Sequence, residues 1–350
     1  MAKTKKKQLP KEFQSQLETC SFEELKTLFE TYDVNARGGY SKQTALAFPE
    51  CPDNLVRWLV KQGADLDAAD SYGDTPLHSR SGHWSARVEV LLELGADVHQ
   101  GEGLRGTPLH AAASACNAAA AGPLLRYGAR VDALNGDGQT PLAHALRRCN
   151  NVQIPGMADL AAMLLSAGAR RTPEMKESVA RIGKNFEFHR AAFNRDSVEA
   201  TSAGLDKLYE LFGVTPAPRR VQHDGKSTIV AQSARWQDRH QELWDLLVPS
   251  RGAAATVQGE VIRITGKIHR ELDLNGGINW DRQYKKMADA LLTHIASFTP
   301  LKSQSLTEAR DIVEEVKRKQ GDTCRLSELA VEWVARNPTP QPLPPPDYDR

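Results

Sequence analysis

A short pattern that returns about every 32 residues constrains this 350-residue chain more than any other feature. Thr-Pro-Leu starts at Thr75, Thr107 and Thr140, and Thr44 opens a weaker copy, "QTALAF". A second marker keeps the same period, in the segments "QGADLD" (62–67), "LGADVH" (94–99), "YGARVD" (127–132) and "AGARRT" (167–172). Two markers that share one period indicate an array of similar structural units that stack on one another.

The repeated residue types suit a pair of helices. A threonine hydroxyl can cap the first helix, and proline fits its first position because no N–H is needed there. Leucine faces the core between units, and a left-handed glycine ends the second helix. The segments "DSYGD" (70–74) and "NGDG" (135–138) are typical of tight turns. The residues with these roles are Thr75, Thr107, Thr140, Pro76, Pro108, Pro141, Leu77, Leu109, Leu142, Gly63, Gly95, Gly128 and Gly168.

The repeat resembles the ankyrin repeat, over about four units in residues 40–172. The resemblance implies an all-α fold, an ankyrin-repeat solenoid with short β-hairpin tips, whose concave face binds another protein. In that family the histidine of the tetrapeptide forms hydrogen bonds within and between repeats. His78 and His110 match it, and His144 replaces it in the third copy. We therefore interpret these histidines as structural.

The flanking segments lack the repeat. Residues 1–39 should form a solvated basic arm (Lys3, Lys5, Lys6, Lys7 and Lys11) and a capping helix opened by a Ser21–Glu24 capping box. Helices within 173–215 should cover Leu160, Met163 and Leu164 of the last unit.

The C-terminal half is predicted to form a separate, non-repetitive helical domain over residues 222–337. It resembles a helical region of uncharacterised bacterial ankyrin proteins, and that resemblance implies no activity. The proline-rich segment 338–350 is predicted to be a disordered tail.

Composition narrows the possible partners. Lys and Arg number 45 against 44 Asp and Glu, a net charge of +1, so no strong field attracts nucleic acid. No segment approaches the ~18 apolar residues of a membrane span. The five cysteines are dispersed and odd in number, as expected for free thiols in a reducing compartment. We expect a cytoplasmic protein without cofactor or metal, and no membrane or nucleic-acid partner.

The candidate protein-binding residues depart from the repeat pattern and are expected to be exposed. Arg80 and Arg147 should form a positive stripe on the concave face, which favours an acidic or phosphate-rich partner. Alternatively, these arginines pair with Asp74, Glu89 or Asp137, and Trp84 packs between helices. The candidates are Tyr72, Arg80, His83, Trp84, Arg105, Arg147 and Arg148.

Two function hypotheses follow. The favoured one is a non-enzymatic interaction scaffold, for example an inhibitor or immunity-type binder, because no recognised catalytic motif occurs. The alternative is an enzyme whose C-terminal domain carries the chemistry while the repeats select the substrate. Glu260 and Asp281 would then act as acid and base, although Glu260 and Arg263 could equally form an intrahelical ion pair. The pocket hypothesis comprises Glu260, Arg263, Asn279, Trp280 and Asp281.

Overall fold

The computed structural model describes residues 4–85, 87–101 and 105–349, and it is mainly helical, with 56% helix and 4% strand. The mainly α-helical prediction is confirmed, although the chain also has a small three-stranded sheet. Within the described residues, no helix has both the length and the apolar character required to cross a bilayer. Contacts divide the chain into two compact units. Unit 1 runs to Phe186 and includes Asn194–Ala217, and unit 2 comprises Glu187–Phe193 and the chain from Pro218 onward.

The basic segment near the N-terminus is a strand rather than a free arm. Strand β1 (Lys6–Gln8) pairs in parallel with β2 (Tyr32–Gly38), which pairs antiparallel with β3 (Gln43–Thr44). The lysine side chains of β1 are exposed, but its main chain is tied into the sheet, and Leu9 is buried directly after it. Lys3 lies outside the described residues.

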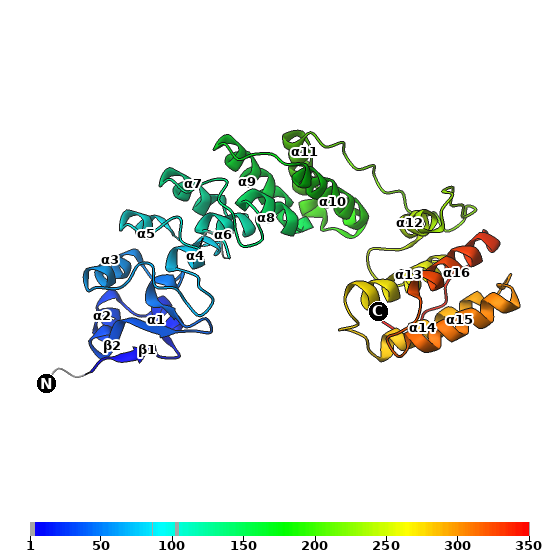
Figure 1. Cartoon of the computed structure of the whole chain (residues 1–350), viewed down its shortest axis with the longest axis horizontal. Helices are drawn as coiled ribbons and strands as arrows, with labels where there is room; N and C mark the ends of the chain where they lie inside the picture. Colours follow the sequence, from blue (N-terminus) through cyan, green and yellow to red (C-terminus); the bar gives the residue numbers. More distant parts are fainter. Residues whose placement is uncertain (1–3, 86, 102–104, 350) are drawn as a thin grey trace. The chain divides into compact units, whose positions relative to one another are not determined.

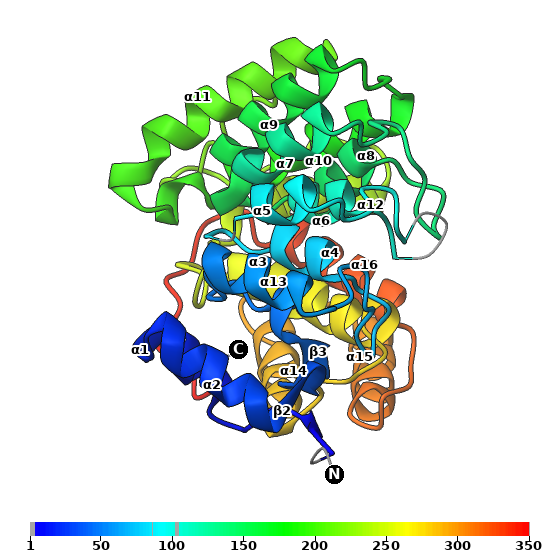
Figure 2. The ribbon, with the colours of Figure 1, turned by 90° about the vertical axis from the view of Figure 1, so that its left-hand side faces the viewer.

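Two short helices lie between the first two strands. Helix α1 spans Phe13–Thr19, and α2 spans Phe22–Thr31 and packs against β2 (Figure 2). The predicted capping box is confirmed, since the Ser21 hydroxyl accepts the Glu24 amide and the Glu24 carboxylate accepts the Ser21 amide. The buried rings of Phe13 and Phe29 meet edge to face and anchor both helices to the core.

The repeats build two rows of helices in unit 1, seen in the blue-to-green part of Figure 1. Each first helix packs on the first helix of the next unit, and each second helix packs likewise. The first helices are η1 (Ala45–Ala47), α4 (Pro76–Ser81), α6 (Pro108–Ser114) and α8 (Pro141–Arg148). The second helices are α3 (Asp53–Lys61), α5 (Glu89–Glu93), α7 (Ala118–Arg126) and α9 (Ile154–Ser166), the last preceded by the single turn η2 (Asn151–Gln153).

The local roles predicted for most of the repeated residues are confirmed. The hydroxyls of Thr75 and Thr140 accept the amides of His78 and Ala143, and a proline follows each of these caps. The repeat leucines have no exposed surface, and the glycines after the second helices have positive φ. The predicted hairpin tips are hydrogen-bonded turns, organised by the side chains of Asp70 and Asn135, and the assigned strands of the described residues all lie near the N-terminus.

Two helices follow the last repeat. Helix α10 spans Pro173–His189, and after the turn η3 (Arg190–Ala192) helix α11 spans Arg195–Phe212. Helix α11 packs along α9, where Leu160 and Leu164 are fully buried while Met163, the third residue expected to be covered, is half-buried. A side chain at Gly204 would lie 2.9 Å from the Pro155 Cα, so this glycine permits the close approach of the two helices.

Unit 2 is a helical domain built around one central helix. Helix α13 packs on three other helices, and every residue from Val257 to Thr265 is buried. A π-helical segment, η4 (Arg270–Leu274), continues α13. The helices are α12 (Trp236–Leu247), α13 (Val257–His269), α14 (Arg282–Ile295), α15 (Ser303–Val316) and α16 (Thr323–Arg336).

The proline-rich C-terminal segment packs against unit 2, so the prediction of a disordered tail is wrong. The amide of Val257 donates to the Gln341 carbonyl (2.8 Å), and the amide of Leu343 donates to the Ala255 carbonyl (3.1 Å). Tyr348 is buried close to the end of the chain. Proline lacks an N–H, but the carbonyls of a proline-rich segment remain strong acceptors. Here the Gln341 carbonyl accepts the backbone amide of Val257, the first residue of α13.

Candidate functional site

An exposed row of side chains follows the turns of consecutive repeats in unit 1. The rings of Tyr40 and Tyr72 stack, with centroids 6.3 Å apart and planes 27° from parallel. The guanidinium of Arg105 lies over the Tyr72 ring, 5.4 Å from its centroid. Tyr40 is 92% exposed and Tyr72 48% exposed. We call Tyr40, Tyr72 and Arg105 the aromatic edge.

Hydrogen bonds of the turns hold the aromatic edge in place. The Ser71 amide and hydroxyl both donate to the Ser41 carbonyl, which ties the second turn to the first. The Asp70 carboxylate accepts the amides of Tyr72 and Asp74, at 2.8 and 3.0 Å. Asp74 in turn forms an ion pair with Arg105, 3.3 Å away. A hydrogen bond with Tyr40 is the main reason why the pKa of Tyr72 lies above its usual value.

A half-buried His83 and an exposed Trp84 form a second aromatic pair. Trp84 is 83% exposed, and its ring stacks on His83 at 6.0 Å, so the alternative in which Trp84 packs between helices is wrong. The His83 carbonyl accepts the Asn117 side-chain amide (2.9 Å), which fixes the loop to the next unit. This pair follows the C-terminus of α4, whereas Tyr72 precedes its N-terminus, so the two groups lie at opposite ends of that helix.

Arg80 is buried, which corrects the prediction that it is exposed. Its Nε donates to the Leu46 carbonyl (2.7 Å), Nη2 to the Cys51 carbonyl (3.1 Å) and Nη1 to the Arg87 carbonyl (3.2 Å). A guanidinium occupied in this way cannot bind a partner or pair with a surface carboxylate. The predicted stripe of Arg80 and Arg147 therefore does not exist.

Arg147 and Arg148 are exposed at the end of α8, as predicted. The Arg147 carbonyl accepts Nη2 of Arg181 from α10 (2.9 Å), and the Leu146 carbonyl accepts the same nitrogen (3.0 Å). The end of α8 is thus fixed by its neighbour, while both guanidinium groups remain accessible.

The repeat histidines have the structural contacts that the sequence indicates. His110 is buried, with Nδ1 3.0 Å from the Thr107 amide in its own unit and Nε2 3.0 Å from the Gln139 carbonyl in the next. Burial lowers the pKa of His110 to about 4, so the ring is neutral at pH 7. His78 lies 3.3 Å from the Asp74 carboxylate, and His144 lies 3.1 Å from the side-chain carbonyl of Gln139.

The predicted acid and base in unit 2 have separate structural roles. Glu260 has no exposed surface and accepts Nε and Nη2 of Arg263, at 2.8 and 2.6 Å, and the Tyr348 hydroxyl at 2.7 Å. Burial by itself would raise the pKa of Glu260, but these partners hold it below its usual value. Asp281 accepts the amides of Gln283 and Tyr284 and caps α14. The acid–base hypothesis for this pair is wrong, because a substrate cannot reach Glu260.

The other two residues of the predicted pocket order a loop. The Asn279 amide donates to the Glu271 carboxylate (2.6 Å), and the Asn279 side chain donates to the same carboxylate. Trp280 stacks on Tyr284, with centroids 5.0 Å apart. Neither residue joins Glu260 in a shared cavity.

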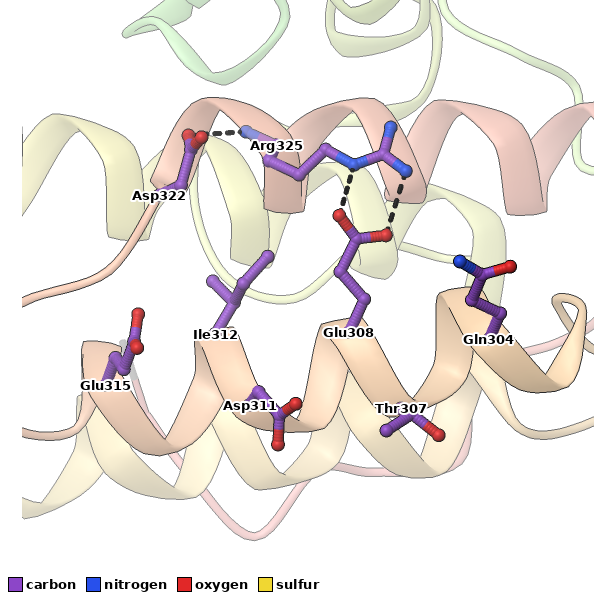
Figure 3. A pocket seen from close by; sticks show the side chains of 8 residues that line it. All are labelled: Gln304, Thr307, Glu308, Asp311, Ile312, Glu315, Asp322 and Arg325. Atoms are coloured by element: carbon purple, nitrogen blue, oxygen red, sulfur yellow. Dashed lines mark hydrogen bonds and ion pairs between the residues drawn. The ribbon is translucent and has the colours of Figure 1, made fainter.

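Unit 2 has an open, mainly acidic depression of about 600 Å³ between α15 and α16 (Figure 3). Arg325 crosses it to the Glu308 carboxylate, with N–O distances of 2.8 and 2.9 Å, and Ile312 lies beside this pair. Asp322 at its end accepts the Arg325 amide. Arg325, the one cation among the described residues that line the depression, is already paired with Glu308, so the depression offers no prepared site for an anionic ligand.

No protein-family model matches this chain, and no curated protein matches it either. The candidate site therefore depends on the geometry alone. Sequence reasoning identified Tyr72 and Arg105 but missed Tyr40. The available signal was its position in the turn before Thr44, as Tyr72 lies in the turn before Thr75, although one residue further from the threonine and in the weakest copy of the repeat.

Proposed function

We propose that unit 1 is an ankyrin-repeat solenoid and that the protein is a cytoplasmic interaction scaffold. The proposal is supported by the repeat period, by the Thr-Pro caps and by the two rows of helices that pack in order from unit to unit. Stacked repeats form a rigid, extended surface, and proteins with this architecture use such surfaces to bind other proteins.

The observation that carries the proposal is the aromatic edge. Tyrosine and arginine are among the residue types that contribute most to binding energy at protein interfaces. Here two exposed rings and a guanidinium are already stacked, and hydrogen bonds of the turns hold them. A prepared surface loses little conformational freedom on binding, so more of the contact energy appears as affinity. We infer that a partner protein binds across this edge.

The enzyme hypothesis has less support. The carboxylate on which it depends is buried and paired with Arg263 and Tyr348. A scaffold that binds a partner without chemistry of its own would act as an inhibitor or immunity-type binder, and this is the class of function that we favour.

The test is affinity capture from host cytosol with the wild-type chain, followed by the double variant Tyr40→Ala/Tyr72→Ala. We expect the double variant to lose the captured protein, because both rings of the edge are removed. Tyr127→Ala is the matched control, since Tyr127 is 47% exposed, close to the 48% of Tyr72, but caps the second helix α7. This control should capture the partner as the wild type does.

Capture that survives the double variant would show that the interface lies elsewhere. Equal loss in the Tyr127→Ala control would show that the partner does not distinguish the aromatic edge. Thermal unfolding of all three chains checks that folding is unchanged, and exposed tyrosines predict only small shifts.

A further inference from the structure

Three side chains with metal-binding atoms meet at one end of α13 in unit 2. They are His269 at the end of α13, Asp273 in the π-helical segment η4 and Cys324 in the first turn of α16. One ligand atom from each lies within 4.8 Å of the others. His269 Nδ1 is 2.8 Å from the Asp273 carboxylate and 2.9 Å from the Thr323 hydroxyl.

This separation fits a zinc ion. Zinc binds thiolate sulfur, imidazole nitrogen and carboxylate oxygen at about 2.0–2.3 Å, so tetrahedral ligand atoms lie about 3.3–3.8 Å apart. The observed separations, from 2.8 Å up to 4.8 Å, surround this range. Side-chain shifts of about 1 Å would bring the three atoms to their places around one ion.

The local structure favours binding in two further ways. The π-helical turn, a rare conformation that is frequent at functional sites, brings Asp273 beside His269. Cys324 lies in the first turn of α16, close to both of the other ligands. Thr323 is buried and donates its hydroxyl to the Asp273 carboxylate, the kind of outer contact that orients a metal ligand.

The geometry points to a zinc-type site formed by His269, Asp273 and Cys324, with water completing the coordination. The ion replaces the direct contact between His269 Nδ1 and the Asp273 carboxylate, and it binds Cys324 as the thiolate, whose proton passes to solvent. His269 and Asp273 are 37% and 42% exposed at their side chains, so an ion can enter from solvent and a fourth position stays open. Three protein ligands with one open position are typical of reactive rather than purely structural zinc sites.

The proposed site differs from the expectation, drawn from the sequence, that the chain binds no metal. A motif search recognises ligands that are near one another in the chain, and here Cys324 follows Asp273 only after two complete helices. The fold alone brings the thiol to the imidazole.

The test is titration of the full-length, chelator-treated chain with Co²⁺ as a spectroscopic substitute for Zn²⁺. We expect one equivalent to produce the near-ultraviolet absorption of a cobalt–thiolate bond, and Zn²⁺ to remove it. Cys324→Ser should abolish this absorption, while Cys20→Ser, a change at a partly exposed cysteine of unit 1, should leave it intact. Thr323→Val should weaken binding about 10–100-fold by removing the hydrogen bond to Asp273.

The wild-type titration is decisive without any variant, since absence of the cobalt–thiolate absorption overturns the proposal. Absorption that persists in Cys324→Ser, or that disappears equally in Cys20→Ser, also overturns it. Because Cys324 is exposed, its replacement by serine should not disturb folding, and circular dichroism confirms this in the same samples. The site lies in unit 2, so its failure would leave the proposed binding function of unit 1 untouched.

Discussion

Arg80 shows how one residue can change role within a repeat. The equivalent positions in the next two units are Ala112 and Ala145, which are buried between helices as small side chains. In the second unit the guanidinium occupies this position and bonds to carbonyls of the preceding unit and of the following loop. The cation is therefore part of the core. A charge reversal at Arg80 would test folding and not binding.

We predict that Arg80→Leu lowers the free energy of unfolding by about 3 kcal/mol. The substitution leaves buried carbonyls without their donors, and each such group costs about 1–3 kcal/mol. Arg148→Leu, at an exposed arginine at the end of α8, should change stability by less than about 0.5 kcal/mol. Urea denaturation followed by circular dichroism measures both. Similar midpoints for the two variants would contradict the structural role of Arg80.

At the scale of elements, α13 and the C-terminal segment depend on each other. The first half of α13 is buried all round, so even its polar side chains need partners inside the protein. The Gln258 amide donates to the carbonyls of Asn337 and Thr339, and its own carbonyl accepts the Gln341 amide. The Tyr348 hydroxyl, also in this segment, donates a hydrogen bond to the Glu260 carboxylate. The C-terminal segment therefore completes the polar contacts of the central helix.

We predict that Tyr348→Phe destabilises the protein by about 1.5–3 kcal/mol, since it removes one hydrogen bond to a buried carboxylate and keeps the ring. Tyr40→Phe is the matched control and should be nearly neutral, because the Tyr40 ring is exposed. Chemical denaturation of the two full-length variants and of the wild type measures the difference. If Tyr348→Phe proves as stable as the control, the Tyr348–Glu260 contact contributes nothing to the fold.

At the scale of the whole molecule, the chain forms two units with separate cores. The core of unit 1 includes the repeat leucines and the buried face of α11, and the core of unit 2 surrounds α13. Each unit also carries its own proposed site, the aromatic edge in unit 1 and the metal ligands in unit 2. Partner binding and metal binding should therefore be separable by truncation.

We predict that a chain ending at Ala217 folds and still captures the partner protein. A chain ending at Arg171 should aggregate, because it uncovers Leu160 and Leu164 by removing α11. Size-exclusion chromatography and thermal unfolding of the two truncated chains make the comparison. Equal solubility and equal melting temperature would show that α11 is not a cap.

The sequence by itself determined the features that arise from local interactions. A Thr-Pro cap acts within three residues, and a glycine with positive φ acts at its own position, so the period of these residues predicted the helix ends of unit 1. Of the candidate site, Tyr72, Trp84 and Arg105 were identified because residues that depart from a repeat stand out against it. The exposure of Arg147 and Arg148 was also anticipated.

Only the tertiary structure decided which distant groups meet. Arg80 is buried because its guanidinium donates to carbonyls 34 and 29 residues earlier. Tyr348 is buried because its hydroxyl donates to the carboxylate of Glu260, 88 residues earlier. The stack of Tyr40 on Tyr72, and the approach of Cys324 to His269 and Asp273, likewise join residues from different elements. Such contacts follow from the packing of helices, so the local pattern of residue types does not predict them.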